Sequence, residues 1–489
     1  MKELPELSGR GGNAALVAAA VFLALALRAV FFSALTGYDE FAYARIAGDI
    51  ADGAFRFPDV SGYYGFRYLV TFPAALFHKL FGQTPYSTAA WPLLCSLGNT
   101  VLAYLLGREL FSRGAAVLAA FFQAFLPISV IYGTMLYPDE IPVFWTGLSA
   151  LFFLKGAKLP GGWGGAGLFA LSGLCAGLGW HTRLNSAVML LVYAVWALRN
   201  GFRPAHLALA GGFLAALLPD WAVGAALAGD PFFSLRSQLA KLSADYHIAP
   251  RGHFIYLRGL LGLDLYGLAL YGFYLYFFAA AAAVSFYKKE AGRLWLPLAW
   301  FTIVTAYLEF GPSSLSPYRP VHKELRFLSM AFFPVILTSA WFVSGFRSVR
   351  SRALAAAFLL STSAGASWKM CAYRAAEAAP HRLAAGYLGG HPATVIYADG
   401  SWRNSLGYYL RDKHKEPYYR GTAAGKGFIR PLWDAGLAGP VPGSCAVAEI
   451  RIGNPGDNND RLSPAGLRLK KEAAEQFDVI GAARIYCFK

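Results

Sequence analysis

Long apolar stretches separated by short polar connections dominate the first 370 residues of the chain. A helix needs about 20 consecutive apolar residues to cross the hydrocarbon core of a bilayer. The stretches 141–154 and 184–198 are short for this purpose, so a tilted or re-entrant segment is the alternative there. The pattern as a whole predicts about eleven membrane-spanning helices, over 13–36, 86–107, 114–136, 141–154, 164–180, 184–198, 205–228, 257–286, 294–310, 326–345 and 351–370.

The composition agrees with a membrane protein. Hydrophobic residues make up 56% of the 489 residues and charged residues only 15%, whereas an ordinary soluble domain has roughly 25% charged residues. Too few charges remain to cover several soluble domains, which excludes a purely cytosolic enzyme, a disordered chain and a small disulfide-rich secreted protein. We therefore expect a polytopic α-helical membrane protein that is surrounded by membrane lipids.

The net charge of +16 does not indicate a nucleic-acid partner, because the sequence has no nucleic-acid-binding motif and the basic residues punctuate the apolar stretches. The positive-inside rule makes the connections that carry basic clusters cytoplasmic. Eleven crossings then place the residues after about 371 outside, and a composition rich in Ala, Gly and Arg indicates a bacterial inner (plasma) membrane. The basic clusters occupy alternate connections, at Lys2, Arg10, Arg108, Arg113, Lys155, Lys158, Arg199, Arg203, Lys288, Lys289, Arg293, Arg347, Arg350 and Arg352.

Two regions on the predicted outer side are too long to be turns. Residues 37–85 are rich in aromatic, Gly and Pro residues, which indicates short helices lying in the membrane interface. Further along, "ATVIYADG", "SCAVAEIRI" and "RIYCFK" have strand patterns, and "SWRNSLGYYLRDK" is typical of a helix. We predict a transmembrane module over 1–370 and a small extracytoplasmic α/β domain over 371–489, in which Cys445 and Cys487 could pair.

Two pairs of adjacent carboxylates are the first candidates for chemistry. Asp39 and Glu40 follow the first apolar stretch, where partial desolvation would raise a carboxylate pKa and suit a general base; a helix-end cap is the alternative. Asp139 and Glu140 lie between the third and fourth stretches, after the helix breaker Pro138. That second pair could bind a divalent metal or orient sugar hydroxyls, and a plain turn is the alternative.

A third cluster precedes the tenth apolar stretch and consists of His322, Lys323, Glu324 and Arg326. Its cations could bind a phosphate group, Arg326 through a two-pronged hydrogen bond and Lys323 as a point charge. An ordinary charged helix end is the alternative interpretation.

Two further arginines lie outside these clusters. Arg183 follows His181 on the predicted outer side and offers a second phosphate contact, whereas His181 is interpreted as an ordinary interfacial residue. Arg28 lies within the first apolar stretch, where a charge is costly unless it is paired or reaches the interface. Because it is about two turns from the outer end of that stretch, we expect its side chain to extend to the interface.

With these motifs assembled, the chain resembles the GT-C superfamily of integral-membrane glycosyltransferases over roughly residues 13–345. "TGYDEFAYARIAGDI" looks like the first-loop motif whose Asp or Asp-Glu is catalytic, which Asp39 or Glu40 would match. "HKELRFL" looks like the His-Lys-Glu-x-Arg-Phe motif of the dolichol-phosphate-mannose-dependent mannosyltransferases of GPI-anchor and N-glycan assembly. "HTRLNSAVM" is similar to the Arg-Pro-Thr region of the same branch, with Leu184 and Asn185 where Pro-Thr is usual.

The resemblance implies an inverting transferase that moves mannose or another hexose from a polyprenyl-phosphate donor to a glycan or lipid-linked acceptor on the extracytoplasmic face. Asp39 or Glu40 would be the base, and Lys323, Arg326 and Arg183 would hold the departing phosphate. The mechanism requires no cofactor, because cationic side chains can neutralise a monophosphate; the second acidic pair leaves a divalent metal open.

A transporter or lipid flippase is the alternative function. Transporters carry ionisable residues near the membrane midplane and are commonly built from repeated halves. Here the ionisable residues gather at one predicted face and neither half of the chain repeats the other, which favours the transferase.

The alternating basic clusters generate a test of topology. With the native cysteines replaced, single cysteines near residues 60, 240 and 400 should react with a membrane-impermeant maleimide in spheroplasts. Cysteines near residues 110, 200 and 290 should react only after permeabilisation, because the basic connections stay in the cytoplasm. Labelling near residue 400 only after permeabilisation would contradict the eleven-span arrangement.

Overall fold

The computed structural model of the chain forms two compact units. The first comprises Met1–Phe32, Ser61–Val70 and Ala89–Cys371, and the second comprises Ser33–Val60, Thr71–Thr88 and Ala372–Lys489. This grouping differs from the predicted domains because it joins two segments of the first long loop to the C-terminal chain. The structure describes residues 10–33, 35–57, 64–159, 163–245, 254–262, 264–289, 291–315, 318–393, 395–398, 400–411, 429–430, 440–449 and 473–489.

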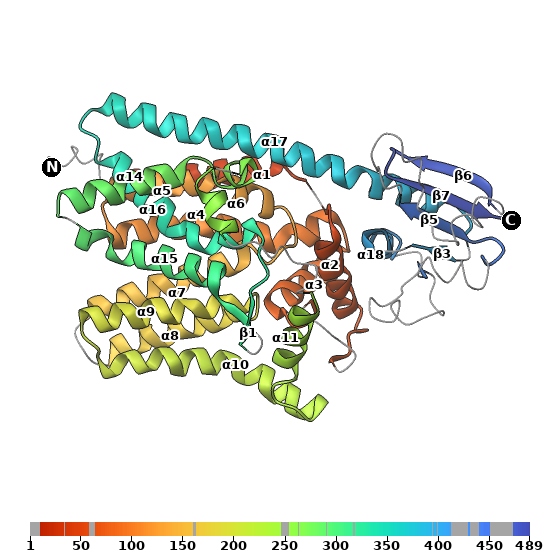
Figure 1. Cartoon of the computed structure of the whole chain (residues 1–489), viewed down its shortest axis with the longest axis horizontal. Coiled ribbons are helices and arrows are strands. Elements are labelled where there is room, and N and C mark those ends of the chain that lie inside the picture. The colour runs from red at the N-terminus through yellow and green to blue at the C-terminus, as the bar shows by residue number, and fades with distance from the viewer. Residues whose placement is uncertain are drawn as a thin grey trace. The chain divides into compact units, whose positions relative to one another are not determined.

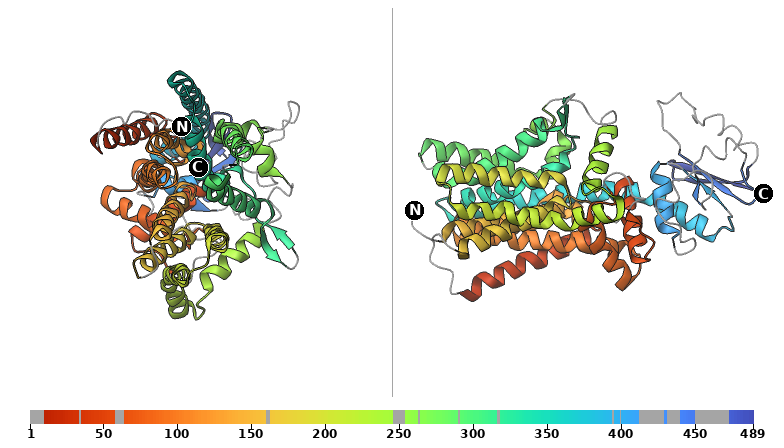
Figure 2. Two further views of the ribbon diagram at one scale, coloured as in Figure 1. Left: turned by 90° about the vertical axis from the view of Figure 1, so that its left-hand side faces the viewer. Right: turned by 90° about the horizontal axis from the view of Figure 1, so that it is seen from below.

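The first unit is a bundle whose long helices run roughly side by side (Figures 1 and 2). A short antiparallel hairpin, β1 (Pro312–Leu315) and β2 (Tyr318–Pro320), accompanies the helices. The helices of this unit are α1 (Arg10–Val30), α4 (Pro85–Leu110), α5 (Arg113–Phe125), α6 (Pro127–Tyr132), α7 (Glu140–Lys158), α8 (Trp163–Trp180), α9 (Val188–Asn200), α10 (Leu207–Ala228), α11 (Phe233–Asp245), α12 (Ile255–Leu260), α13 (Leu265–Tyr271), α14 (Tyr274–Tyr287), α15 (Trp295–Phe310), α16 (Ser329–Ser344) and the first part of α17 (Val349–Gly390).

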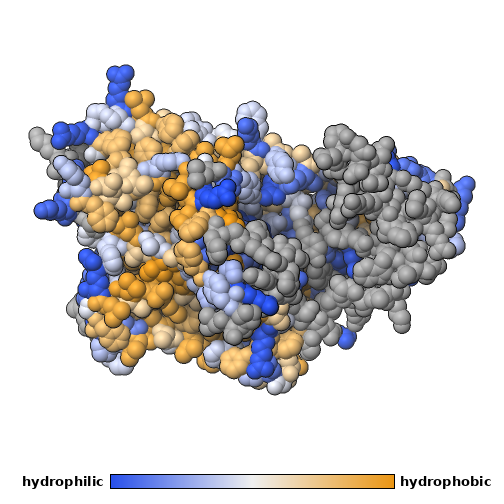
Figure 3. Space-filling model, in the orientation of Figure 1, coloured by the Kyte–Doolittle hydropathy of each residue, from blue (hydrophilic) through white to orange (hydrophobic). Residues whose placement is uncertain are grey.

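Apolar side chains cover the flank of the bundle that Figure 3 shows, as expected of a surface in contact with lipid. By length and composition, four helical segments of the described chain could cross a membrane, or five if the bent pair α13–α14 is one span. The count of eleven spans therefore stays a prediction. The four segments are Gly12–Val30, Pro85–Leu110, Pro204–Ala228 and Leu325–Ser344.

The apolar stretch 257–286, predicted as one span, is broken into α12, α13 and α14. Gly262 and Gly272 have positive φ angles of 70° and 60°, a conformation that glycine adopts without a steric penalty. Between them, the Asp264 carboxylate accepts a hydrogen bond from the N–H of Tyr266 and caps α13. As a result α13 and α14 meet at 80°, which hydrophobicity alone does not reveal.

Helices α8 and α10 approach each other closely because glycines line their contact. A Cβ atom on Gly173 would lie 1.9 Å from the carbonyl oxygen of Leu209, and one on Gly212 would lie 2.0 Å from the carbonyl oxygen of Ala170. Such distances are impossible for any larger residue without separating the helices. Small residues at a helix contact are a common way of packing helices in membranes.

The second unit combines a five-stranded sheet with α2 (Tyr38–Ala51), α18 (Gly400–Tyr409), most of α3 (Tyr68–Phe81) and the end of α17. The sheet has the order β4-β3-β5-β7-β6, with β3 parallel to β4 and β5, and β7 antiparallel to β5 and β6. Its strands are β3 (Ile396–Tyr397), β4 (Ile429–Arg430), β5 (Cys445–Glu449), β6 (Ala473–Val479) and β7 (Ala483–Phe488).

Three strands and one helix of the predicted C-terminal α/β region are confirmed, since β3, β5, β7 and α18 overlap the four sequence patterns quoted above. Cys445 and Cys487 face each other on β5 and β7 and form a disulfide. The strands β4 and β6 were not predicted, because "IR" is too short for a pattern and "AAEQFDV" does not alternate apolar and polar residues throughout.

Candidate functional site

In the first unit, Asp139 is buried between two arginines. It immediately precedes α7, and its Oδ1 lies 3.3 Å from Nη2 of Arg183 while its Oδ2 lies 3.9 Å from Nη1 of Arg326. Burial raises the pKa of the Asp139 carboxyl, and the charges of the two guanidinium groups act in the opposite direction. Three segments that are distant in the sequence thus meet around one carboxylate.

Aromatic rings hold the same two guanidinium groups from another side. Cζ of Arg183 lies 3.9 Å from the ring centre of Phe327, and Cζ of Arg326 lies 4.4 Å from the ring centre of Tyr137. A cation over an aromatic face is attracted by the ring quadrupole. Together with Asp139, the rings fix the planes of both arginines, so the two positive charges are ordered within the protein.

Glu324 connects His322 with Arg326. Its Oε1 lies 2.8 Å from Nε2 of His322 and its Oε2 lies 2.5 Å from Nε of Arg326, while its backbone N–H donates to the hydroxyl of Tyr256. Burial opposes ionisation of this carboxyl, but the charge of Arg326 and the hydrogen bond from His322 outweigh it and lower the pKa of Glu324 to about 2. Three of the predicted residues therefore form one connected group.

Lys323 has a different partner from its neighbours in sequence. Its Nζ lies 2.5 Å from Oε1 of Glu309, and both side chains are buried. The second carboxylate oxygen of Glu309 accepts a hydrogen bond from the N–H of Tyr256. The positive charge of Lys323 is thus balanced inside the protein by a carboxylate on α15.

Glu140 points away from Asp139 into a separate polar network. Its Oε2 accepts hydrogen bonds from Oγ of Ser129 and from Nδ2 of Asn99. Ser129 in turn accepts a hydrogen bond from Arg28. The two members of this acidic pair therefore take part in different clusters.

Arg28 does not reach the interface, so that expectation was wrong. Its side chain is 1% exposed and donates hydrogen bonds to the hydroxyls of Ser96 and Ser129 and to the carbonyls of Ala24 and Ala124. A buried guanidinium needs acceptors for its N–H groups, and neighbouring helices supply them here. Arg28 links α1 to α4, to the end of α5 and to α6.

In the second unit, Asp39 and Glu40 open helix α2. Glu40 is fully buried, and its Oε1 accepts hydrogen bonds from the N–H and the hydroxyl of Thr36 and from the N–H of Gly37. These are donors that a helix start leaves without partners in the helix. Glu40 therefore acts as a cap, whereas Asp39 is only partly buried.

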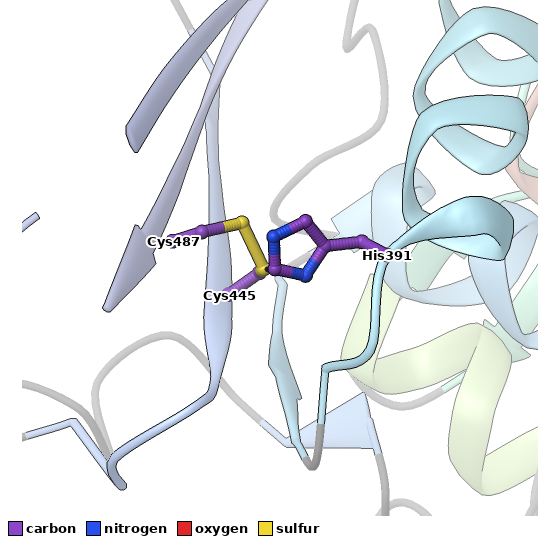
Figure 4. Close-up of side chains that lie close together, drawn as sticks. All are labelled: His391, Cys445 and Cys487. Carbon is purple, nitrogen blue, oxygen red and sulfur yellow. Dashed lines mark hydrogen bonds between the residues drawn. A yellow bond between two sulfur atoms is a disulfide. The ribbon is translucent and has the colours of Figure 1, made fainter. Parts of the chain in front are cut away.

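A group with metal-ligand atoms lies elsewhere in the described part of the second unit. Figure 4 shows His391 beside Cys445 and Cys487, with ligand atoms within 4.8 Å of one another. The two sulfur atoms are bonded to each other. A disulfide offers no thiolate to a metal, so in this state the group is a structural cross-link between β5 and β7.

Comparison with known proteins gives one family match and several structural matches. Residues 68–221 match the family model of dolichyl-phosphate-mannose-protein mannosyltransferase. The fold resembles ArnT from Cupriavidus metallidurans, bound to undecaprenyl phosphate (TM-score 0.69, 15% identity, 98% of both chains) and in the apo state (TM-score 0.66, 12% identity, 96% of this chain and 97% of ArnT).

A third structure extends the fold comparison to an archaeal protein. The oligosaccharyltransferase AglB from Archaeoglobus fulgidus, in complex with an inhibitory peptide and a dolichol-phosphate, matches with a TM-score of 0.53 and 14% identity over 81% of this chain and 63% of AglB. A comparison with curated protein sequences finds no match.

These findings confirm the resemblance inferred from the motifs. The chain shares its fold with the ArnT and AglB structures, and the mannosyltransferase family match covers residues 68–221. Asp139 and Arg183 fall within the family match at 68–221, whereas Asp39, Glu40 and the cluster before α16 lie outside it. The roles assigned to individual residues stay predictions.

Sequence reasoning missed several residues of these clusters. Glu309 was a recoverable omission, since a carboxylate inside an apolar stretch signals a buried partner, here Lys323. Tyr256 carried no such signal, because aromatic residues are common throughout the sequence, and Phe327 belongs to the quoted motif but was given no role. Their importance follows only from their contacts with Glu324 and Arg183.

The lowered pKa of Glu324 predicts a pH-dependent contribution to stability. Since the folded-state pKa is about 2 and the ordinary value is 4.5, ionised Glu324 stabilises the fold above about pH 4.5, and this effect is lost as the pH falls towards 2. Glu324→Gln should therefore lower the melting temperature in detergent at pH 7, with a difference from wild type that shrinks below about pH 4.5. A difference that is the same at pH 7 and pH 3 would contradict this assignment.

Proposed function

We propose that the protein is an inverting glycosyltransferase that uses a polyprenyl-phosphate-linked sugar, mannose or another hexose, as donor. The acceptor is a glycan or lipid-linked glycan, and transfer takes place on the extracytoplasmic face. The observation that carries the proposal is the buried Asp139 that holds Arg183 and Arg326 together. Its support from relatives is the mannosyltransferase family match and the likeness to an ArnT structure bound to undecaprenyl phosphate.

Two ordered arginines suit a phosphate leaving group. As the bond between the anomeric carbon and the phosphate oxygen breaks, negative charge accumulates on the phosphate, and guanidinium groups bind it through charge-assisted hydrogen bonds. Asp139 and the aromatic rings of Tyr137 and Phe327 hold both guanidinium groups in place before the donor arrives. The contacts are then stronger in the transition state than in the ground state, which is what lowers the barrier.

We assign the general base to Asp39 and a structural role to Glu40. The acceptor hydroxyl attacks the anomeric carbon, its proton passes to the base, and polyprenyl phosphate departs. Oε1 of Glu40 already accepts three hydrogen bonds at the start of α2, so this oxygen is engaged in holding the start of the helix. Asp39 carries the other carboxylate of the pair and is partly exposed.

The roles of Lys323 and Glu140 follow from their partners. Because Lys323 is paired with Glu309, we propose that it fixes the segment before α16 and affects the phosphate indirectly through Arg326. Because Glu140 accepts hydrogen bonds from Ser129 and Asn99, we propose that it anchors the start of α7 and thereby Asp139.

The base assignment predicts different losses in two matched variants. Asp39→Asn should lower the turnover of a purified polyprenyl-phosphate hexose donor by about 10²–10⁴-fold, because proton removal is lost. Glu40→Gln should lose less, because the amide oxygen still accepts the N–H bonds of Thr36 and Gly37. Donor binding and protein yield serve as controls. Equal losses in both variants, or near-normal turnover in Asp39→Asn, would overturn the assignment.

The phosphate site predicts that Arg326 variants affect the donor more than the acceptor. Arg326→Ala should raise the donor KM and lower kcat, with a loss in kcat/KM equivalent to about 1.5–3 kcal/mol for a charge-assisted contact, and acceptor KM should change little. Arg326→Lys should recover only part, because it keeps the charge and loses the planar fork. The exposed Arg236, changed to Ala, is the matched control. An unchanged donor response would exclude this site.

A further inference from the structure

One face of α2 packs against α18 within the second unit. Phe41 lies with its ring centre 5.7 Å from that of Tyr408 and 5.6 Å from that of Tyr409. Arg45 and Asp49 follow at intervals of four residues, the spacing that places side chains on one side of a helix. The side of α2 that carries the apolar Phe41 therefore also carries the charged Arg45 and Asp49.

Arg411, just beyond the end of α18, binds one carboxylate of α2 and one directly after its end. Its Nη2 lies 2.7 Å from Oδ1 of Asp49 and 3.2 Å from Oδ2 of Asp52. The side chains of Arg411 and Asp49 are 6% and 0% exposed. Replacing one partner of such a buried ion pair strongly destabilises a protein, because the other partner is left as an uncompensated charge.

Two glycines allow this close approach, one on each helix. A Cβ atom on Gly48 would lie 2.8 Å from Nε of Arg411, and one on Gly407 would lie 2.5 Å from Cζ of Arg45. Each helix thus has a glycine where the arginine of the other passes. The packing is reciprocal, and a larger residue at either position would displace an arginine.

We propose that Arg411 and α18 position α2, so that the C-terminal region is a working part of the transferase. The inference rests on the proposed function, in which Asp39 at the start of α2 is the base. Asp49 is ten residues further along the same helix, about 15 Å at 1.5 Å per residue. Because a helix transmits displacement along its axis, fixing Asp49 and Asp52 fixes the direction in which the first turn points. Arg411 is therefore a positioning residue and does not itself touch substrate.

The kinetic test uses the full-length protein in detergent with a polyprenyl-phosphate hexose donor. Arg411→Met should lower kcat by about 10²-fold, the typical cost of displacing a reacting group by about 1 Å, with the donor KM within about twofold of wild type. Arg411→Lys should recover part of kcat. Asp49→Asn should lower kcat similarly, and the double variant should lose no more than Arg411→Met alone, because both changes remove the same interaction.

A matched control comes from the sheet of the same unit. Arg484 on β7 pairs with Asp478 on β6 at 2.9 Å and is partly exposed. Arg484→Met removes an Arg–Asp pair that is not on α2, so kcat should stay within about twofold of wild type. A loss of kcat as large as that of Arg411→Met would mean that any damage to the C-terminal region lowers activity, and would overturn the specific role of Arg411.

A second measurement is independent of activity. Spin labels at Arg56→Cys, shortly after α2, and at Arg382→Cys, on α17, report a distance within the second unit in the absence of any substrate. The distribution should be narrow in wild type and Arg411→Lys, and broad in Arg411→Met and Asp49→Asn. If Arg411→Met does not fold, the distance distribution of Asp49→Asn tests the proposal in its place.

The possible outcomes separate the inference from the proposed function. Broad distributions in the variants of a protein that transfers no polyprenyl-phosphate sugar would refute the function and leave the positioning of α2 standing. Unchanged distributions would overturn the positioning. Broad distributions with unchanged kcat would show that the contact stabilises the fold without serving the reaction, which would also overturn it.

Discussion

The burial of Asp139 between Arg183 and Arg326 is the interaction on which the candidate site depends. Two guanidinium groups repel each other, and in a water-poor environment their repulsion is weakly screened. The Asp139 carboxylate between them attracts both guanidinium groups and offsets their mutual repulsion. Without it, the segments that carry the two arginines would have no electrostatic reason to converge.

The same constraint explains the surroundings of the cluster. Every charge taken from water needs a counter-charge or a set of hydrogen bonds. Lys323 has Glu309, and Arg28 has two hydroxyls and two carbonyls. The contacts of Arg28 with Ser96, Ala124 and Ser129 join segments that are far apart in the sequence, so these polar residues also fix how the helices of the bundle are arranged.

The two acidic pairs follow one structural rule. Successive residues of a helix point about 100° apart, so two adjacent carboxylates at a helix start face different directions. In both pairs the glutamate is buried and hydrogen-bonded, where Glu40 caps α2 and Glu140 binds Asn99 and Ser129. Asp39 and Asp139 are left for other partners. In each Asp-Glu pair, the glutamate thus anchors the helix start and the aspartate is the candidate for the chemical role.

Local sequence was sufficient for the features that depend on neighbouring residues. Apolar stretches predicted where helices form, because hydrophobic length and periodicity are local properties. Alternating apolar residues predicted β5 and β7, and the position of each Asp, Glu and Arg at the ends of apolar stretches identified the members of the clusters. The break of 257–286 was missed, because it depends on the backbone angles of Gly262 and Gly272.

The partner of each charge was decided only by the tertiary structure. The sequence grouped Lys323 with Arg326 and Asp139 with Glu140, yet folding separates the members of both sets. It joins Arg411 to Asp52, which is 359 residues away in the chain. No local pattern encodes such a contact, because the partner of a buried charge is set by which helices pack together, and that choice depends on the fit of their whole surfaces.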